Sequence, residues 1–269
     1  MAHAQHLQFV QIAAQHLADD FTQKRILEIG SYNVNGSIRP FFQGSTYVGV
    51  DIIPGPDVDV VCPGEKFADP DETFDMTVSC ECFEHNPQWR ETFLNMYRMT
   101  KPGGVIIFTC ATTGRLEHGT TRTLPDSSPG NVSVGWDYYN NLKERDFTSR
   151  MRFDDLFKDY FFTKNAAAQD LYFIGLKNGR DSIFRFGGKE FAAEYHREAA
   201  ALQAQLDAQS PYPAMLRLMS KIVLSPLRVA ECLPDRQYQN FALAYIKTFN
   251  VMRRPVQRLY EQFRVKRQS

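Results

Sequence analysis

The chain has 269 residues, of which 43% are hydrophobic, and this is enough for one large domain or two modest ones with a buried core. Its 31 Lys and Arg residues balance 31 Asp and Glu residues, so the net charge points to no nucleic-acid or membrane partner. No run of about 18 apolar residues predicts a membrane-spanning helix, and residues 1–20 lack the basic and apolar regions of a secretory signal. Five irregularly spaced cysteines fit neither a disulfide framework nor paired zinc knuckles, so we expect free thiols and a cytoplasmic protein.

The first part of the chain alternates predicted helices and strands. Leu7, Val10, Ala14 and Leu17 recur at three- and four-residue spacing and predict an amphipathic helix, which the strand RILEIG follows. Further strands are predicted at 46–52, 58–62 and 73–80, then a helix at 87–99, a KPGG turn and a strand at 105–111. This alternation indicates a mainly parallel sheet that helices cover on both faces.

The pattern stops between Thr112 and Gly135, in a segment rich in Gly, Pro, Ser and Thr. A loop of this length inside a compact domain is usually functional or disordered. A helix is predicted around 148–157, and two strands within 160–179 predict an antiparallel hairpin that closes the sheet. Helical stripes from Phe191 to Phe263 follow. We therefore expect an α/β domain at 1–185 and a C-terminal helical extension at 186–269.

The turn after the first predicted strand, GSYNVNG, lies where open α/β sheets bind their ligands. It lacks the G-x-G-x-x-G spacing of dinucleotide-binding proteins. Glu28 also places a carboxylate beside the turn, which disfavours a phosphate and suits an ammonium group. Asp51, at the end of the next strand, suits the vicinal hydroxyls of a ribose. Together these features predict a nucleoside that carries an amino acid and no phosphate, as S-adenosylmethionine does.

The stretches ILEIGSYNVNG, YVGVDI, FDMTVSCECFEH and MTKPGGVIIFTCA resemble, in order and spacing, the motifs of class I S-adenosylmethionine-dependent methyltransferases. The resemblance spans about residues 25–111. It implies a Rossmann-like seven-stranded, mainly parallel sheet with one antiparallel strand, and S-adenosylmethionine as the cofactor. In one respect the chain departs from the family: its glycine motif is longer than usual. The cofactor-binding residues that the resemblance implies are Glu28, Gly30, Tyr32, Asn33, Gly36, Asp51, Ile52, Glu65, Cys80 and Glu81.

Methyl transfer to a hydroxyl gains from a general base, and histidine suits this task near neutral pH. His118, in the long loop, is the first candidate, and His85 and Tyr139 are the others; packing for His85 and a solvated loop position for His118 stay open as structural alternatives. Glu81, Glu84 and His85 could bind a metal, as a similar E-x-x-E-H set does in some ubiquinone and small-RNA methyltransferases. The same letters are common in relatives without metal, so we expect a metal-independent reaction. His3, His6 and His16 are expected to take no part in the site.

The acceptor is predicted from WDYYNN, at 136–141, whose rings and amides suit a carbohydrate or another polyol, with a core aromatic cluster as the alternative. This stretch, GSYNVNGSIRP and EHGT resemble bacterial methyltransferases of polysaccharide biosynthesis, which implies a hydroxyl acceptor on a small molecule or glycan. A nucleic-acid methyltransferase, a non-catalytic cofactor-binding subunit and a nicotinamide oxidoreductase are the alternatives. The basic segment 247–269 either is solvated or contacts an anionic membrane or polyanion, and its aromatic stripe suits packing on the domain or on a second subunit.

Overall fold

The computed structural model describes residues 3–179, 189–210, 219 and 221–249. The chain divides into two compact units, residues 1–211 and residues 212–269. The sequence places the boundary at 185/186 instead. The difference arises from helix α6 (Lys189–Ala208), whose Phe191 and Tyr195 are buried in a core of the first unit. That helix therefore belongs to the α/β unit and not to a separate extension.

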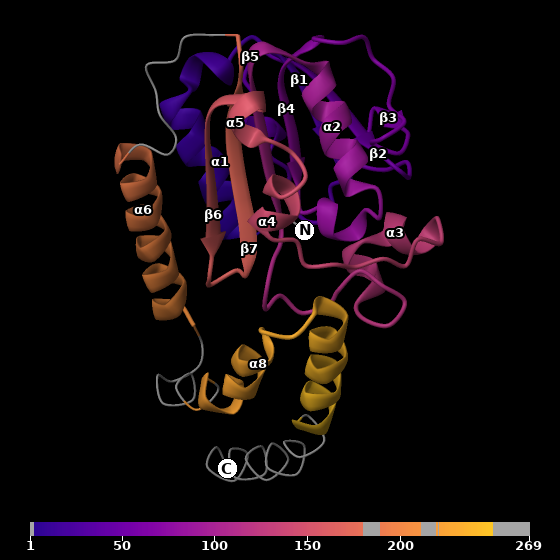
Figure 1. Ribbon diagram of the computed structural model, residues 1–269, viewed down its shortest axis with the longest axis vertical. Coiled ribbons are helices and arrows are strands. Elements are labelled where there is room, and N and C mark those ends of the chain that lie inside the picture. Colours follow the sequence, from indigo (N-terminus) through magenta and orange to yellow (C-terminus); the bar gives the residue numbers. More distant parts are fainter. Residues whose placement is uncertain (1–2, 180–188, 211–218, 220, 250–269) are drawn as a thin grey trace, which may run out of the picture. The chain divides into compact units, whose positions relative to one another are not determined.

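A seven-stranded sheet in the order β3-β2-β1-β4-β5-β7-β6 forms the centre of the first unit (Figure 1). Strand β7 pairs antiparallel with β5 and β6, and the pairs among β1 to β5 are parallel. The chain order reverses between β1 and β4, the kind of place where open α/β sheets bind ligands. The predicted Rossmann-like sheet with one antiparallel strand is confirmed. The strands are β1 (Arg25–Ile29), β2 (Thr46–Asp51), β3 (Val60–Val61), β4 (Phe74–Cys80), β5 (Thr100–Ala111), β6 (Phe157–Asn165) and β7 (Asp170–Lys177).

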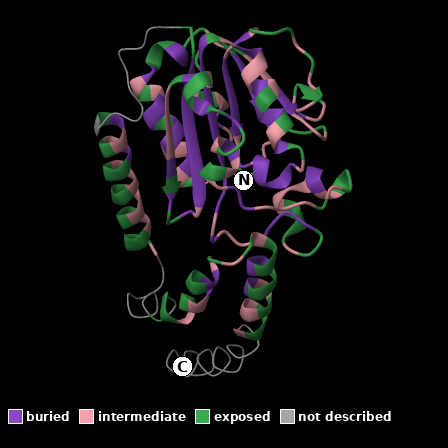
Figure 2. Cartoon of the chain, viewed as in Figure 1, coloured by how far each residue is buried: buried purple, intermediate pink, exposed green. Residues whose placement is uncertain are grey.

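Helices cover both faces of this sheet. Helices α1 (Ala4–His16) and α6 share one apolar core, whereas α2 (Trp89–Met99), α4 (Glu144–Thr148) and α5 (Phe153–Leu156) contribute to the other. Neighbouring strand residues alternate between the two cores, since Ile107 lies in the first and Phe108 in the second. The central strands are consequently buried over most of their length (Figure 2).

One predicted helix differs from the structure. The helix predicted around 148–157 is two short helices, α4 and α5. Arg152 leaves the helical region with φ −79° and ψ 88°, and Phe157 already begins β6. Between β1 and β2, residues 30–38 form an irregular turn and a one-turn 3₁₀ helix, η2 (Arg39–Phe41), follows.

In the second unit the structure describes α8 (Ser225–Ala230) and helical residues 235–249. Tyr245 Oη donates a hydrogen bond of 2.6 Å to the carbonyl of Val223. Most of the basic segment lies at 250–269, outside the described residues, so its predicted contacts stay predictions. Within the described part of the chain, no helix combines the length and apolar character needed to cross a bilayer.

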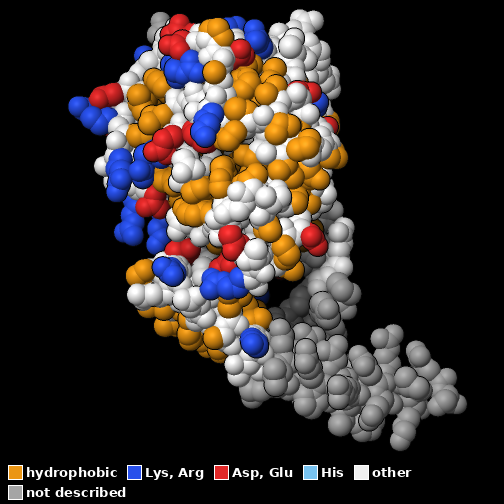
Figure 3. All heavy atoms as spheres, turned by 90° about the vertical axis from the view of Figure 1, so that its right-hand side faces the viewer, with side chains coloured by type: hydrophobic (Ala, Val, Ile, Leu, Met, Phe, Trp, Pro, Cys, Tyr) orange, Lys and Arg blue, Asp and Glu red, His pale blue; other side chains and the backbone are white. Residues whose placement is uncertain are grey.

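The surface carries mixed charge. On the face in Figure 3, Lys and Arg side chains are interspersed with Asp and Glu. Elsewhere among the described residues, surface charges form ion pairs, including Arg25 with Asp69 at 3.2 Å and Lys101 with Asp75 at 2.7 Å. This face therefore carries no broad patch of one sign.

Candidate active site

A pocket lies at the carboxyl ends of β1, β2 and β4. The turn after β1, the end of β2, the segment after β4 and the region around α3 (Pro129–Ser133) form its wall. Glu65 lies outside this wall, although its neighbours Cys62 and Gly64 are part of it. Most of the predicted cofactor residues line the pocket, namely Glu28, Gly30, Tyr32, Gly36, Asp51, Ile52, Cys80 and Glu81.

Asp51 presents a carboxylate at the end of β2. Its Oδ2 accepts the Tyr32 N–H at 3.0 Å and its Oδ1 accepts the Ile52 N–H at 2.7 Å. Burial raises the pKa of this carboxyl above its usual range, and the backbone N–H groups oppose that rise. Each carboxylate oxygen has a further lone pair, so both can accept bonds from vicinal hydroxyls. The geometry fits a ribose.

The turn after β1 takes its shape from Gly30 and Asn33. Gly30 has φ +84°, and a Cβ there would lie 2.5 Å from Cys82 Cβ. Asn33 Oδ1 accepts the Gly36 N–H at 2.7 Å, while its Nδ2 donates to Asp57 at 2.8 Å. Asn33 does not line the pocket; its side chain instead holds the wide turn that the sequence shows in place of a tight glycine motif.

Glu28 is a buried acid in the pocket wall. Its Oε2 accepts a hydrogen bond of 2.8 Å from Tyr47 Oη. Burial raises the pKa of Glu28 to about 7, despite this hydrogen bond. A cation beside it would favour the ionised form. The site therefore fits the ammonium group that the sequence predicts there.

The three candidate catalytic residues converge. The ring centroids of His85 and His118 lie 5.0 Å apart, and Tyr139 lies 5.5 Å from His85 and 5.1 Å from His118. His85 lines the pocket, whereas His118 and Tyr139 do not. Gly119 permits this packing, because a Cβ at its position would lie 2.8 Å from His85 Cε1. His118 is only 6% exposed, so it is not the solvated loop residue of the structural alternative.

Both histidines of this cluster are neutral near pH 7. Burial lowers the pKa of His118 to about 4 and that of His85 well below its usual value. His118 Nδ1 lies 3.0 Å from the carbonyl of Leu116, which can only accept. The proton therefore sits on Nδ1, and the lone pair of Nε2 is available.

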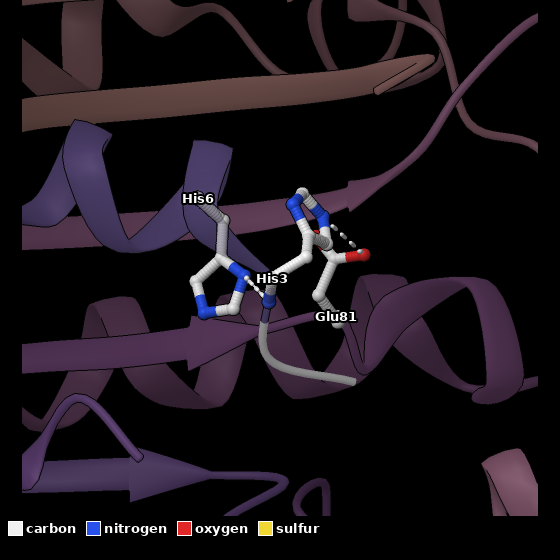
Figure 4. Close-up of side chains that lie close together, drawn as sticks. All are labelled: His3, His6 and Glu81. Atoms are coloured by element: carbon white, nitrogen blue, oxygen red, sulfur yellow. Dashed lines mark hydrogen bonds and ion pairs between the residues drawn. The ribbon is translucent and has the colours of Figure 1, made fainter. Parts of the chain in front are cut away.

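Two of the three N-terminal histidines, His6 and His3, lie at or beside the pocket, whereas the sequence analysis expects no part for them in the site. His6 lines the pocket, and its Nδ1 accepts the His3 N–H at 3.1 Å. His3 Nε2 lies 3.6 Å from Glu81 and 2.8 Å from Asp170, and Figure 4 shows Glu81 beside His3. Nothing in the local sequence signals this role, since only the fold brings the start of α1 to the carboxyl ends of the strands.

Residues 27–108 match a family model described as a methyltransferase domain. Over these residues the chain contains a methyltransferase domain, which agrees with the class I S-adenosylmethionine-dependent methyltransferases that the sequence motifs resemble. This confirms the resemblance seen in the sequence, and the domain implies S-adenosylmethionine as the cofactor of the methyltransferase. The residues at the predicted ribose and ammonium positions fit that cofactor.

Several solved methyltransferases are similar to this one in fold. The Burkholderia thailandensis 1,6-didemethyltoxoflavin-N1-methyltransferase is 13% identical over 66% of this chain and 92% of its own, with a TM-score of 0.41. The Haemonchus contortus phosphoethanolamine N-methyltransferase 2 is 16% identical over 64% and 52%, with a TM-score of 0.44. The CurJ carbon methyltransferase is 14% identical over 65% and 54%, with a TM-score of 0.45. No curated protein matches the chain.

Proposed function

We propose that the methyltransferase transfers the methyl group of S-adenosylmethionine to a hydroxyl of a small molecule or a glycan. The observation that carries this proposal is the neutral His118 with its available Nε2, packed against the pocket residue His85. A hydroxyl is a weak nucleophile until its proton is removed, so it gains more from such a base than an amine does.

The chain's residues orient the acceptor and receive its proton. When bound, the cofactor supplies the electrophilic methyl group. Alignment of the acceptor oxygen with the methyl carbon can contribute roughly 7–11 kcal/mol to barrier lowering. In this scheme His118 takes the hydroxyl proton, and His85 and Tyr139 fix the position of its ring through their edge contacts.

Trp136 supports a sugar-like acceptor. It lines the pocket and is half-buried, so its ring can stack on the apolar face of a sugar. The amides nearby have structural roles instead. Asn131 Nδ2 donates to Gly119 at 2.7 Å and to Tyr138 at 2.8 Å, and Asn141 Nδ2 donates to Arg115 at 2.9 Å. We therefore assign acceptor stacking to Trp136, with polysaccharide biosynthesis in the cytoplasm as the proposed setting.

A nucleic-acid acceptor is the second candidate, and the mixed charge of the face in Figure 3 argues against it. Nucleic-acid binding rests mainly on clustered Lys and Arg that contact phosphates. The basic segment at 247–269 is the one feature that favours it, and most of this segment lies outside the described residues.

The test is a screen with S-adenosylmethionine labelled in its methyl group. Nucleotide sugars, glycan fragments and small polyols are compared with RNA and DNA, and the product is analysed by mass spectrometry and NMR. We expect a methyl ether on a sugar or another polyol. Methylation of a nitrogen or carbon atom, or of nucleic acid alone, would refute the proposal.

A further inference from the structure

Three buried side chains that lie close together, one of them in the pocket wall, carry polar atoms without a hydrogen-bond partner. Among the described residues, Glu84 Oε1 and Oε2, His85 Nδ1 and His118 Nε2 have no hydrogen-bond partner. Glu84 is fully buried, and both histidines are more than nine-tenths buried. One potential ligand atom from each residue lies within 4.8 Å of the others.

Such a cluster is costly as it stands. Buried polar groups normally have hydrogen-bond partners, and here Glu84, His85 and His118 each carry at least one polar atom that has none. A cation between the three side chains would give such atoms a ligand to bind.

The other ring nitrogens of His118 and His85 are held by hydrogen bonds, as in many metal sites. Metal-binding histidines usually donate the second ring N–H to a carbonyl or carboxylate, which fixes the tautomer. His118 does so through Nδ1, 3.0 Å from the Leu116 carbonyl. The His85 ring makes a backbone hydrogen bond at Tyr138, and its Nδ1 faces the cluster. Both histidines therefore present a lone pair.

We infer that Glu84, His85 and His118 bind a divalent transition-metal ion, with Zn²⁺ as the best match. Two imidazole nitrogens and one carboxylate form a known three-ligand set that leaves a position open. Ligand atoms that are each about 2.1 Å from one ion lie at most about 4.2 Å from one another. The three candidate ligand atoms lie within 4.8 Å of one another, so shifts of under about 1 Å in their positions would close the site around an ion.

This set differs from the one that the sequence suggested. Glu81 lies beside His3 at 3.6 Å and its backbone has φ +53° (Figure 4). Glu81 is thus held beside His3, and His118 takes its place near Glu84 and His85. The sequence analysis considers Glu81, Glu84 and His85 as the possible metal ligands and expects a metal-independent reaction. In the structure Glu81 groups with His3 and His6, whereas Glu84 and His85 group with His118.

The proposed ion adjoins the pocket through His85 and would deepen the proposed function, on which this step rests. An acceptor hydroxyl at the open position would lose its proton to solvent, because a bound cation lowers the hydroxyl pKa. The oxygen would then form a bond to the methyl carbon, while the carbon–sulfur bond breaks and leaves its electron pair on sulfur. With the ion bound, His118 would serve as a ligand, and the ion would take over the activation of the hydroxyl that the proposed function gives to its Nε2.

The test measures metal binding directly, without turnover. Full-length protein stripped with a chelator is titrated with Zn²⁺, Mn²⁺ and Mg²⁺ in a calorimeter, and Co²⁺ absorption reports the ligand field. Wild type and His196→Ala, an exposed histidine variant, should bind about one Zn²⁺. Glu84→Gln and His118→Ala should bind Zn²⁺ at least about 100-fold more weakly and lose the Co²⁺ spectrum.

Absence of binding in the wild type, or binding that both substitutions leave unchanged, would overturn the inference. Circular dichroism of each variant checks folding, and His118→Gln replaces any variant that fails this check. The two proposals can fail separately. A chelated enzyme that still forms methyl ethers refutes only the metal site. A metal-binding enzyme that methylates nitrogen or carbon refutes only the hydroxyl acceptor.

Discussion

His3 Nε2 lies 2.8 Å from Asp170 Oδ2, and this contact joins the start of α1 to the start of β7. The same nitrogen lies 3.6 Å from Glu81 in the pocket wall. One imidazole thus lies between two buried acids, Glu81 after the end of β4 and Asp170 at the start of β7.

Loss of the His3 charge should destabilise the protein at alkaline pH. Burial alone lowers the pKa of His3, but hydrogen bonds and charges from Asp170 and Glu81 outweigh it and raise the pKa to about 9. The unfolded value is about 6.5. Because the pKa of His3 is higher in the folded protein than in the unfolded one, protonated His3 stabilises the fold. This contribution is complete below about pH 6.5 and is lost as the pH rises through about 9.

We expect this ion pair to account for about 1–3 kcal/mol between these limits. The measurement is urea unfolding of wild type and His3→Gln at pH 6.5 and pH 9. The difference between the two proteins should be large at pH 6.5 and small at pH 9. Equal differences at both pH values would show that His3 acts through packing. His196→Gln is the matched exposed control.

Cofactor binding should release a proton from Glu28. Its pKa is about 7 in the free protein, because of burial, so the group is mostly protonated at pH 6. The ammonium group of the bound cofactor would lower that pKa and ionise the acid. The affinity should therefore rise with pH from about 4.5 to 7.

Calorimetry at pH 6 in two buffers of different ionisation enthalpy measures the released proton. Glu28→Gln should bind more weakly and release fewer protons. If wild type and Glu28→Gln release the same number, Glu28 is not the group that titrates.

Asp51→Ala should weaken cofactor binding. The substitution removes acceptors for two ribose hydroxyls, and hydrogen bonds to a charged group are worth about 1.5–3 kcal/mol each. We expect a loss of at least 10-fold, roughly, in the affinity for S-adenosylmethionine and for S-adenosylhomocysteine. Asp71→Ala, at an exposed position, is the control. Unchanged affinity in Asp51→Ala would remove Asp51 from the cofactor site.

Gly30→Ala and Gly135→Ala separate backbone strain from steric overlap. Both glycines have positive φ, +84° and +77°, but an added Cβ meets Cys82 at 2.5 Å only at Gly30. Gly135→Ala should cost about 1–2 kcal/mol of stability and leave cofactor affinity intact. Gly30→Ala should lower the stability by more than this and should also weaken cofactor binding. Thermal melts measure the stability, and calorimetry measures the binding. Equal costs would mean that Cys82 yields freely.

His118→Ala should lower kcat by about 10²-fold or more, with little change in cofactor affinity. If His118 acts as the base and not as a metal ligand, the wild-type rate should fall as the pH drops through about 4, where the pKa of the buried His118 lies, and this limb should be absent in the variant. Tyr139→Phe should stay active, because Tyr139 Oη donates to Asn141 at 3.1 Å. A near-normal His118→Ala beside an inactive Tyr139→Phe would exchange the two roles.

The sequence alone determined the sheet, its antiparallel strand and the place of the pocket at the ends of the strands. These follow from local patterns, because strand runs, turn glycines and strand-end acids such as Glu28 and Asp51 have their roles wherever a parallel sheet forms. The boundary of the α/β unit depended on packing instead. Phe191 and Tyr195 are buried only because α6 contacts the sheet layer that α1 also covers.

Only the tertiary structure decided which residues share the catalytic end of the pocket. The E-x-x-E-H spacing places Glu81 near His85 along the chain, yet its carboxylate lies 3.6 Å from His3 Nε2. His118 approaches His85 across a loop that needs Gly119 for close packing. Contacts between distant segments depend on how loops fill the space over the sheet, and no spacing rule in the sequence records that.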